Sequence, residues 1–200
     1  TYDKLGRLMG EKSIYGEYIY RYDDMGNIQS DGLTYTNGKL TSVKGKAVEY
    51  DELGNPVIYK GKEMKWEQGR KLAEGSQNGK DFIYEYDGNG MRYRKEVEGK
   101  TTEYYWNGNE LLFESREGER IFYIYDVTGI AGMLYRNEVY YYDKNTLGDV
   151  VAVRNEDGEV EAMYCYDAWG NHKVLDSNGA ENRSEGFIGN INPIRYRGYY

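Results

Sequence analysis

One histidine and one cysteine are the residues best suited to nucleophilic chemistry in this chain of 200 residues. A histidine-based triad would have to combine His172 with Cys165 or a serine, because the base must lie within hydrogen-bond reach of the nucleophile. Cys165 falls in an expected strand, whereas His172 follows an expected turn at Gly170. We interpret Cys165 as an apolar strand residue and His172 as an exposed one. One cysteine and one histidine cannot form a structural zinc site, so we expect no metal.

The sequence motifs of other enzyme classes are absent. No phosphate loop and no His-Glu-x-x-His motif occurs, and Gly75-Ser76 lacks the spacing of a nucleophile elbow. Residues 155–159 resemble part of a calcium loop, but a hairpin turn explains them better. The 34 acidic residues make chance carboxylate pairs unavoidable, so they are weak support for a glycosidase. We predict no catalytic residue, no cofactor and no enzymatic activity.

Charge and composition narrow the possible partners. The net charge of −8 repels a phosphate backbone, so we expect no nucleic-acid binding. No apolar run approaches the length of a transmembrane helix, so we expect no membrane insertion. The chain has 24 tyrosines against 4 phenylalanines and 3 tryptophans. Tyrosine must therefore supply most of the large apolar area, and each ring brings a hydroxyl that needs a partner.

The pattern Tyr-Asp-x-x-Gly recurs along the chain and indicates internal repetition. Six copies lie at 2–6, 22–26, 50–54, 86–90, 125–129 and 166–170. Degenerate copies keep an aromatic residue and a glycine at 35–38, 66–69 and 105–108, and Tyr142-Asp143 has its glycine delayed to Gly148. The ten anchor aromatics are Tyr2, Tyr22, Tyr35, Tyr50, Trp66, Tyr86, Tyr105, Tyr125, Tyr142 and Tyr166. A spacing near 20 residues fits one β-hairpin with its connection.

Turn chemistry explains the repeated motif. An aspartate at the first turn position accepts backbone N–H groups further on, and glycine is favoured at the fourth. We expect the preceding tyrosine to end a strand and to lay its ring on the next hairpin. Further hairpin turns are predicted at Asp31-Gly32, Asn78-Gly79, Glu98-Gly99, Glu117-Gly118 and Asp157-Gly158. No helix is predicted, and 180–192 is expected to be a loop or a poorly ordered connection.

These repeats resemble the RHS/YD-repeat family over nearly the whole chain. Residues 22–28, Tyr-Asp-Asp-Met-Gly-Asn-Ile, are similar to the repeat unit of that family. Residues 147–153 and 164–170 resemble the start of the RHS-associated core, and 192–200 its next element. We therefore predict a YD-repeat array over 1–141 and the start of the core over 142–200, continuous with the same sheet.

The resemblance implies an all-β fold of tandem antiparallel β-hairpins, forming a curved or spiralling sheet that is part of an RHS-type β-shell. The family's self-cleavage region and toxin lie beyond the match, so neither activity is carried over. We expect an open sheet with unpaired or capped edges, because ten repeats are too few to close a shell. The resemblance also implies a secreted or cell-surface bacterial protein.

Two functions remain open at this point. The first is a scaffold that encloses or presents a C-terminal toxin or effector, with flanking RHS repeats and that toxin domain as partners. The alternative is an extracellular adhesion module that binds carbohydrate or a partner protein through Tyr-rich surfaces.

Overall fold

The computed structural model describes residues 1–13, 16–30, 32–77 and 79–200. The chain divides into two compact units, unit 1 (Thr1–Glu103) and unit 2 (Tyr104–Tyr200). Asp31 and Asn78, where two of the hairpin turns are predicted, lie outside the described residues.

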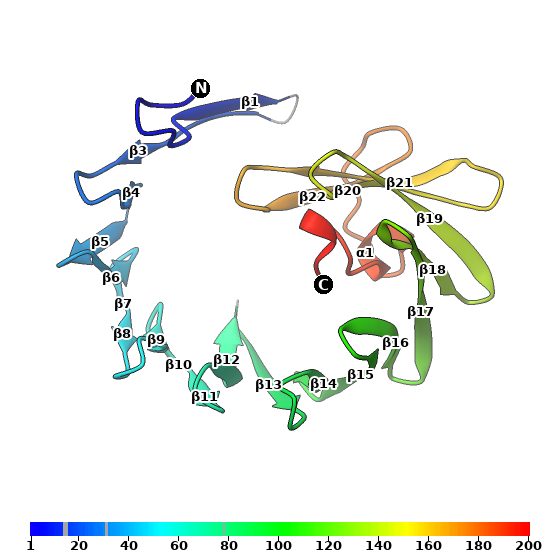
Figure 1. Ribbon diagram of the computed structural model, residues 1–200, viewed down its shortest axis with the longest axis horizontal. Coiled ribbons are helices and arrows are strands. Elements are labelled where there is room, and N and C mark those ends of the chain that lie inside the picture. Colours follow the sequence, from blue (N-terminus) through cyan, green and yellow to red (C-terminus); the bar gives the residue numbers. More distant parts are fainter. Residues whose placement is uncertain (14–15, 31, 78) are drawn as a thin grey trace. The chain divides into compact units, whose positions relative to one another are not determined.

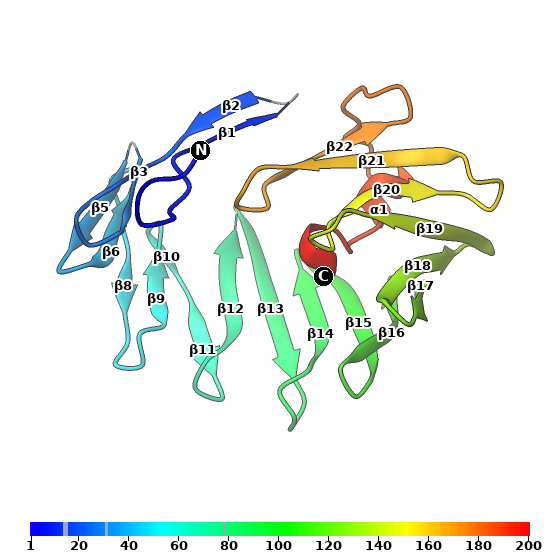
Figure 2. The same ribbon diagram turned by 45° about the horizontal axis from the view of Figure 1, so that its top comes forward.

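Unit 1 is a series of short antiparallel hairpins, which Figure 1 traces from blue to green. Its strands are β1 (Gly10–Ser13), β2 (Gly16–Ile19), β3 (Arg21–Tyr22), β4 (Ile28–Gln29), β5 (Leu33–Thr36), β6 (Lys39–Val43), β7 (Lys46–Ala47), β8 (Glu49–Tyr50), β9 (Pro56–Tyr59), β10 (Lys62–Glu63), β11 (Lys65–Glu67), β12 (Lys71–Gln77), β13 (Lys80–Tyr86) and β14 (Arg92–Val97). Strands β1 to β10 form two-stranded and three-stranded sheets, and β11 begins a longer sheet in which β12 lies beside β13 (Figure 2).

Unit 2 has longer strands. Strand β15 (Lys100–Asn107) leads into it, followed by β16 (Glu110–Arg116), β17 (Glu119–Asp126), β18 (Gly129–Tyr135), β19 (Glu138–Lys144), β20 (Val150–Arg154), β21 (Val160–Tyr166) and β22 (His172–Asp176). Strands β11 to β22 are hydrogen-bonded neighbours in sequence order, and this order has two ends, so the sheet is open. The predicted all-β fold of tandem antiparallel hairpins is confirmed.

An aspartate or asparagine side chain builds the corner between many of these strands. At Asp3, Oδ1 accepts the N–H groups of Leu5 and Arg7, while the N–H of Gly6 donates to the Asp3 carbonyl at 3.1 Å. Gly6 has φ of 77°, a left-handed conformation that glycine adopts without steric cost. In the described part of the chain, eight corners are closed in the same way, by a hydrogen bond of 2.9–3.1 Å from the glycine N–H to the carbonyl of the aspartate or asparagine three residues earlier. They begin at Asp3, Asp23, Asp51, Asp87, Asn145, Asn155, Asp167 and Asp176.

Three of these corners correct or extend the prediction. The glycine delayed to Gly148 belongs to a corner that begins at Asn145, not at Asp143. The turn predicted at Asp157-Gly158 begins two residues earlier, at Asn155, whose Oδ1 accepts the Asp157 and Glu159 N–H groups. The corner at Asp176 was not predicted, because no tyrosine precedes it.

Other hairpins turn through two-residue loops. The turns predicted at Glu98-Gly99 and Glu117-Gly118 are confirmed, and both residues of each have positive φ. Such loops match the right-handed twist of the strands that they join. Residues 126–129 also form a short loop, because Asp126 and Gly129 are paired across strands β17 and β18.

The core lies mainly in unit 2. Its buried cluster is centred on strands β16 to β22 and includes the fully buried Ile121, Met133, Val150 and Val153. In the described part of unit 1, the buried apolar side chains are Val43, Val48, Ala73 and Phe82. Unit 1 therefore depends more than unit 2 does on turns and polar contacts for its stability.

The end of the chain differs from the prediction of a loop over 180–192. A short helix α1 (Ile188–Ile191) packs against β21 and β22, and a 3-10 turn η1 (Tyr196–Gly198) follows (Figure 1). A Cβ at Gly189 would lie 2.7 Å from Val174 and 2.8 Å from Ala162, so glycine permits this close approach. Buried Ile188 holds the helix in the core despite its single turn.

Candidate functional site

The two residues suited to nucleophilic chemistry have separate partners. Cys165 is buried in β21, and its Sγ lies 3.9 Å from the Lys173 carbonyl oxygen. His172 lies in β22, where its Nε2 is 2.7 Å from Nη1 of Arg195. Partial burial and the positive charge of Arg195 lower the pKa of His172, which favours the neutral imidazole as acceptor.

The carboxyl groups with shifted pKa values are held in the charged form. Backbone and side-chain hydrogen bonds lower the pKa of Asp3, Asp23, Asp51 and Asp126 at their turns. A general acid needs the opposite shift. Among the described residues, no group of three His, Cys, Asp or Glu side chains is placed to hold a metal ion, and no helix is long and apolar enough to span a membrane.

Six of the ten anchor aromatics form a repeated contact that we call the aromatic ladder. In each case a ring N–H or O–H donates to the backbone carbonyl of a residue 10 to 16 positions earlier. The pairs are Tyr22 with Leu8, Tyr50 with Leu40, Trp66 with Pro56 and Tyr86 with Leu72 in unit 1, and Tyr125 with Leu111 and Tyr166 with Val150 in unit 2. Distances run from 2.6 to 3.1 Å.

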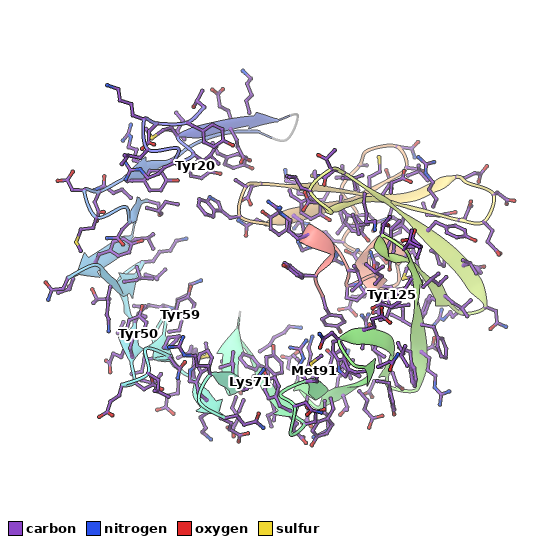
Figure 3. All side chains as sticks on the ribbon, viewed as in Figure 1. Tyr20, Tyr50, Tyr59, Lys71, Met91 and Tyr125 are labelled. Atoms are coloured by element: carbon purple, nitrogen blue, oxygen red, sulfur yellow. The ribbon has the colours of Figure 1, made fainter. Side chains whose placement is uncertain are left out.

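The ladder corrects the predicted direction of the tyrosine rings. Each ring reaches back to a residue earlier in the chain, whereas we expected it to lie on the next hairpin. The acceptor follows a turn glycine by two or three residues: Leu8 follows Gly6, and Val150 follows Gly148. Burial raises the pKa of Tyr86 and Tyr125, so these phenols stay protonated and able to donate. Figure 3 labels Tyr50 and Tyr125 on their separate hairpins.

The anchor predicted at Tyr105 is wrong by one residue. Tyr105 is 42% exposed, whereas its neighbours Tyr104 and Trp106 face the core of unit 2. Successive residues of a strand point to opposite faces, so a one-residue shift moves the ring to the other face. Trp106 is therefore the residue that takes the inward position before Asn107-Gly108.

A buried carboxylate in unit 2 was missed by the sequence analysis. Glu114 is fully buried, and its Oε1 accepts from Arg116 at 2.6 Å and from the Tyr123 hydroxyl at 2.7 Å. Its Oε2 accepts the Tyr200 hydroxyl at 2.5 Å, and Tyr104 donates to the Tyr200 oxygen at 2.9 Å. Both carboxylate oxygens are thus engaged, and burial raises the pKa of Tyr123 and Tyr200.

Asn192 is a second buried polar centre in unit 2. Its Oδ1 accepts the Tyr142 hydroxyl at 2.8 Å and the Ile194 N–H at 3.1 Å. Its Nδ2 donates to the Tyr164 hydroxyl at 3.1 Å and to the Ile194 carbonyl at 2.8 Å. Asn192 and Glu114 therefore attach the C-terminal residues to the sheet.

One group of rings is exposed on unit 2. Tyr105 and Phe113 stack with centroids 4.1 Å apart and planes inclined by 10°, and Phe122 lies 5.1 Å from Phe113. Phe122 is 38% exposed, and it comes from the neighbouring strand β17. We call Tyr105, Phe113 and Phe122 the exposed aromatic strip, because the outer two rings are exposed and can stack on a flat apolar ligand, while Phe113 is half-buried.

Two bacterial proteins are similar to this chain in sequence. The tRNA3(Ser)-specific nuclease WapA of Bacillus spizizenii is 31% identical over 191 residues, covering 85% of this chain and 8% of that protein. The tRNA nuclease WapA of Bacillus subtilis strain 168 matches with the same identity and coverage. The chain thus spans less than a tenth of the length of these relatives.

Solved structures with the same fold come from toxin complexes. A chain of the TcdB2-TccC3-Cdc42 crystal structure has a TM-score of 0.63 at 15% identity, covering 91% of this chain and 11% of that one. A chain of the Photorhabdus luminescens Tc holotoxin pore has a TM-score of 0.57 at 14% identity, covering 90% and 10%. At these identities the likeness shows the fold alone. The family described as the teneurin YD-shell matches residues 1–193. The chain therefore belongs to the teneurin YD-shell family, which confirms the RHS/YD-repeat membership that its motifs predict.

Proposed function

We propose that this chain is a non-catalytic repeat scaffold, a segment of an RHS/YD shell that encloses or presents a C-terminal toxin or effector domain. The aromatic ladder is the observation that carries the proposal. Its hydroxyl and indole groups donate to backbone carbonyls of residues 10 to 14 positions earlier, so these repeated hydrogen bonds hold hairpins together.

The relatives support a scaffold that is one part of a longer protein whose nuclease activity lies elsewhere. Two of them are named tRNA nucleases, and this chain matches 8% of the length of each. The proposal assigns a structural contribution to the matched region. A net charge of −8 and corner carboxyls with lowered pKa values support that assignment, because neither favours contact with RNA phosphates or general-acid chemistry.

The proposal also covers location, partners and domain organisation. We place the chain outside the cell or at its surface, with flanking RHS repeats and a C-terminal toxin domain as its partners. We retain 1–141 as the repeat array and 142–200 as the start of the RHS-associated core.

Two measurements test the scaffold function. Purified chain incubated with total tRNA should leave the tRNA intact. In the full-length protein, the effector should be digested by added protease more slowly than the same effector produced alone. Cleavage of tRNA by the chain itself, or equal digestion of the two effector forms, would contradict the proposal.

The exposed aromatic strip favours a second candidate function, adhesion to carbohydrate or to a partner protein. A glycan array probed with the chain tests it, with Tyr105→Ala as the variant and Tyr141→Ala as the control, because Tyr141 is 48% exposed and lies outside the strip. Adhesion through the strip requires glycan binding that is lost in the first variant and kept in the second. An array without reproducible binding leaves no support for carbohydrate adhesion.

A further inference from the structure

A groove in unit 1 forms where one extended segment changes partners. Strand β10 pairs with β9, with Lys62 opposite Tyr59, whereas β11 pairs with β12, with Lys65 opposite Glu74. Only Met64 separates the two short strands, and its N–H donates to the Val57 carbonyl at 2.9 Å. The partners of β10 and β11 are thus different sheets, and a groove of about 610 Å³ lies at this point.

The change of partner leaves part of a strand edge without a ladder partner, although β10 lies close beside it. Strand β12 continues past Glu74 through Gly75 and Ser76, which pair with Phe82 and Asp81 of β13. Among the described strands, neither residue has a ladder partner on the side of β11. Strand β10 is too close to β12 for another strand to lie between them, so this stretch forms a wall of the groove.

The floor of the groove is apolar. Met64, Leu72, Phe82 and Pro56 line it together with the rings of Tyr59, Trp66 and Tyr84. Gly75 makes room for this packing, because a Cβ there would lie 2.4 Å from the Met64 sulfur and 2.7 Å from the Phe82 ring. Tyr59 is labelled in Figure 3. The floor therefore accepts aliphatic or aromatic side chains of a ligand.

The rim of the groove is positively charged. Lys46, Lys60 and Lys62 line it, all three are exposed, and no lining residue carries a carboxylate. Within the described ranges, none of these three lysines takes part in an ion pair. The rim is therefore locally positive in a chain whose net charge is −8, and Lys60 Nζ lies 5.1 Å from the centre of the Tyr59 ring. A ligand with carboxylates would gain from this field, and a basic ligand would be repelled.

We propose that this groove binds an extended acidic polypeptide in which carboxylates alternate with apolar side chains. The floor would meet its apolar residues and the lysine rim its carboxylates. The proposal deepens the scaffold function and rests on it, since an effector held by the chain would present such a polypeptide. A neutral sugar polymer fits less well, because it brings no negative charge to the lysine rim.

Fluorescence polarisation with a labelled dodecapeptide of alternating glutamate and leucine tests this site directly. Three comparator ligands are used. Two are dodecapeptides, one with lysine in place of glutamate and one with serine in place of leucine, and the third is oligogalacturonate. The acidic–apolar peptide should bind at least about tenfold more tightly than each comparator, and added salt should weaken its binding. Equal binding of the lysine or serine peptide, or tighter binding of oligogalacturonate, overturns the proposal.

A charge variant identifies the site of binding. Replacing Lys46, Lys60 and Lys62 together by glutamine should weaken binding about tenfold, as expected for three exposed charge pairs. The control replaces Lys4, Lys100 and Lys173, which are exposed and outside the groove. Equal effects of the two triple variants overturn the assignment of the groove. The peptide probe is synthetic, so a failure of peptide binding would not change the result of the effector-digestion experiment. Failure of the groove proposal can therefore be told apart from failure of the scaffold function.

Discussion

The aromatic ladder can be tested at a single atom, the hydroxyl oxygen of Tyr86. This hydroxyl donates to the Leu72 carbonyl at 2.9 Å, and both residues are half-buried in unit 1. Tyr86→Phe removes the hydroxyl and keeps the ring. The lost hydrogen bond and the carbonyl left without its partner should together lower the free energy of unfolding by about 1–2 kcal/mol. For a unit of roughly one hundred residues, each kcal/mol lowers the melting temperature by about 4–8 °C.

Thermal and urea unfolding, followed by circular dichroism, measure this loss. The matched control is Tyr93→Phe, because Tyr93 is 44% exposed and its hydroxyl donates to the side chain of Glu85 rather than to the backbone. The control should change the free energy by less than about 0.5 kcal/mol. Equal losses in the two variants would mean that the ladder hydroxyls are ordinary surface groups, and the proposed role of the ladder would be refuted.

Three further predictions concern the corners and the buried carboxylate. Gly54→Val should lower the melting temperature more than Glu52→Ala, because Gly54 has φ of 83° and Glu52 is exposed; equal losses would contradict the turn assignment. Glu114→Gln should lower the free energy of unfolding by about 3–5 kcal/mol by leaving Arg116 without its buried partner, whereas a loss below about 1 kcal/mol in urea unfolding would contradict the cluster. Hydrogen bonds lower the pKa of Asp51 in the folded state, so the charged carboxylate stabilises the fold above the unfolded-state pKa, and this stabilisation is lost as the pH falls through the folded-state pKa. Asp51→Asn should therefore reduce the loss of melting temperature between pH 7 and about pH 2. An unchanged pH profile of the melting temperature would contradict this prediction.

The corners could be predicted because their chemistry is local. An aspartate, two variable residues and a glycine supply every atom of the turn, so the sequence positions them within five residues. The corners at Asn145 and Asp176 were missed because the search required a preceding tyrosine. An amide oxygen accepts the same backbone N–H groups as a carboxylate, and the pattern Asx-x-x-Gly would have found both corners.

The side of the sheet that each ring faces was harder to predict. Tyr104, Tyr105 and Trp106 are consecutive aromatics, so alternation of residue type cannot show which of them point inward. Buried Glu114 depends on Tyr200, which is 86 residues away in the sequence. No local pattern reveals such a partner, and an isolated glutamate in a strand is more often exposed.

The ladder has a direction along the chain, and this has a consequence for synthesis. Each donor depends on an acceptor made 10 to 16 residues earlier, so a new hairpin can complete its bond as soon as it leaves the ribosome or an export channel. Removal of hairpins from the C-terminal end frees carbonyls, which readily bind water at a new surface. Removal from the N-terminal end instead leaves phenol and indole donors without their carbonyl acceptors. The repeat array is therefore suited to grow in one direction, from the first hairpin to the last.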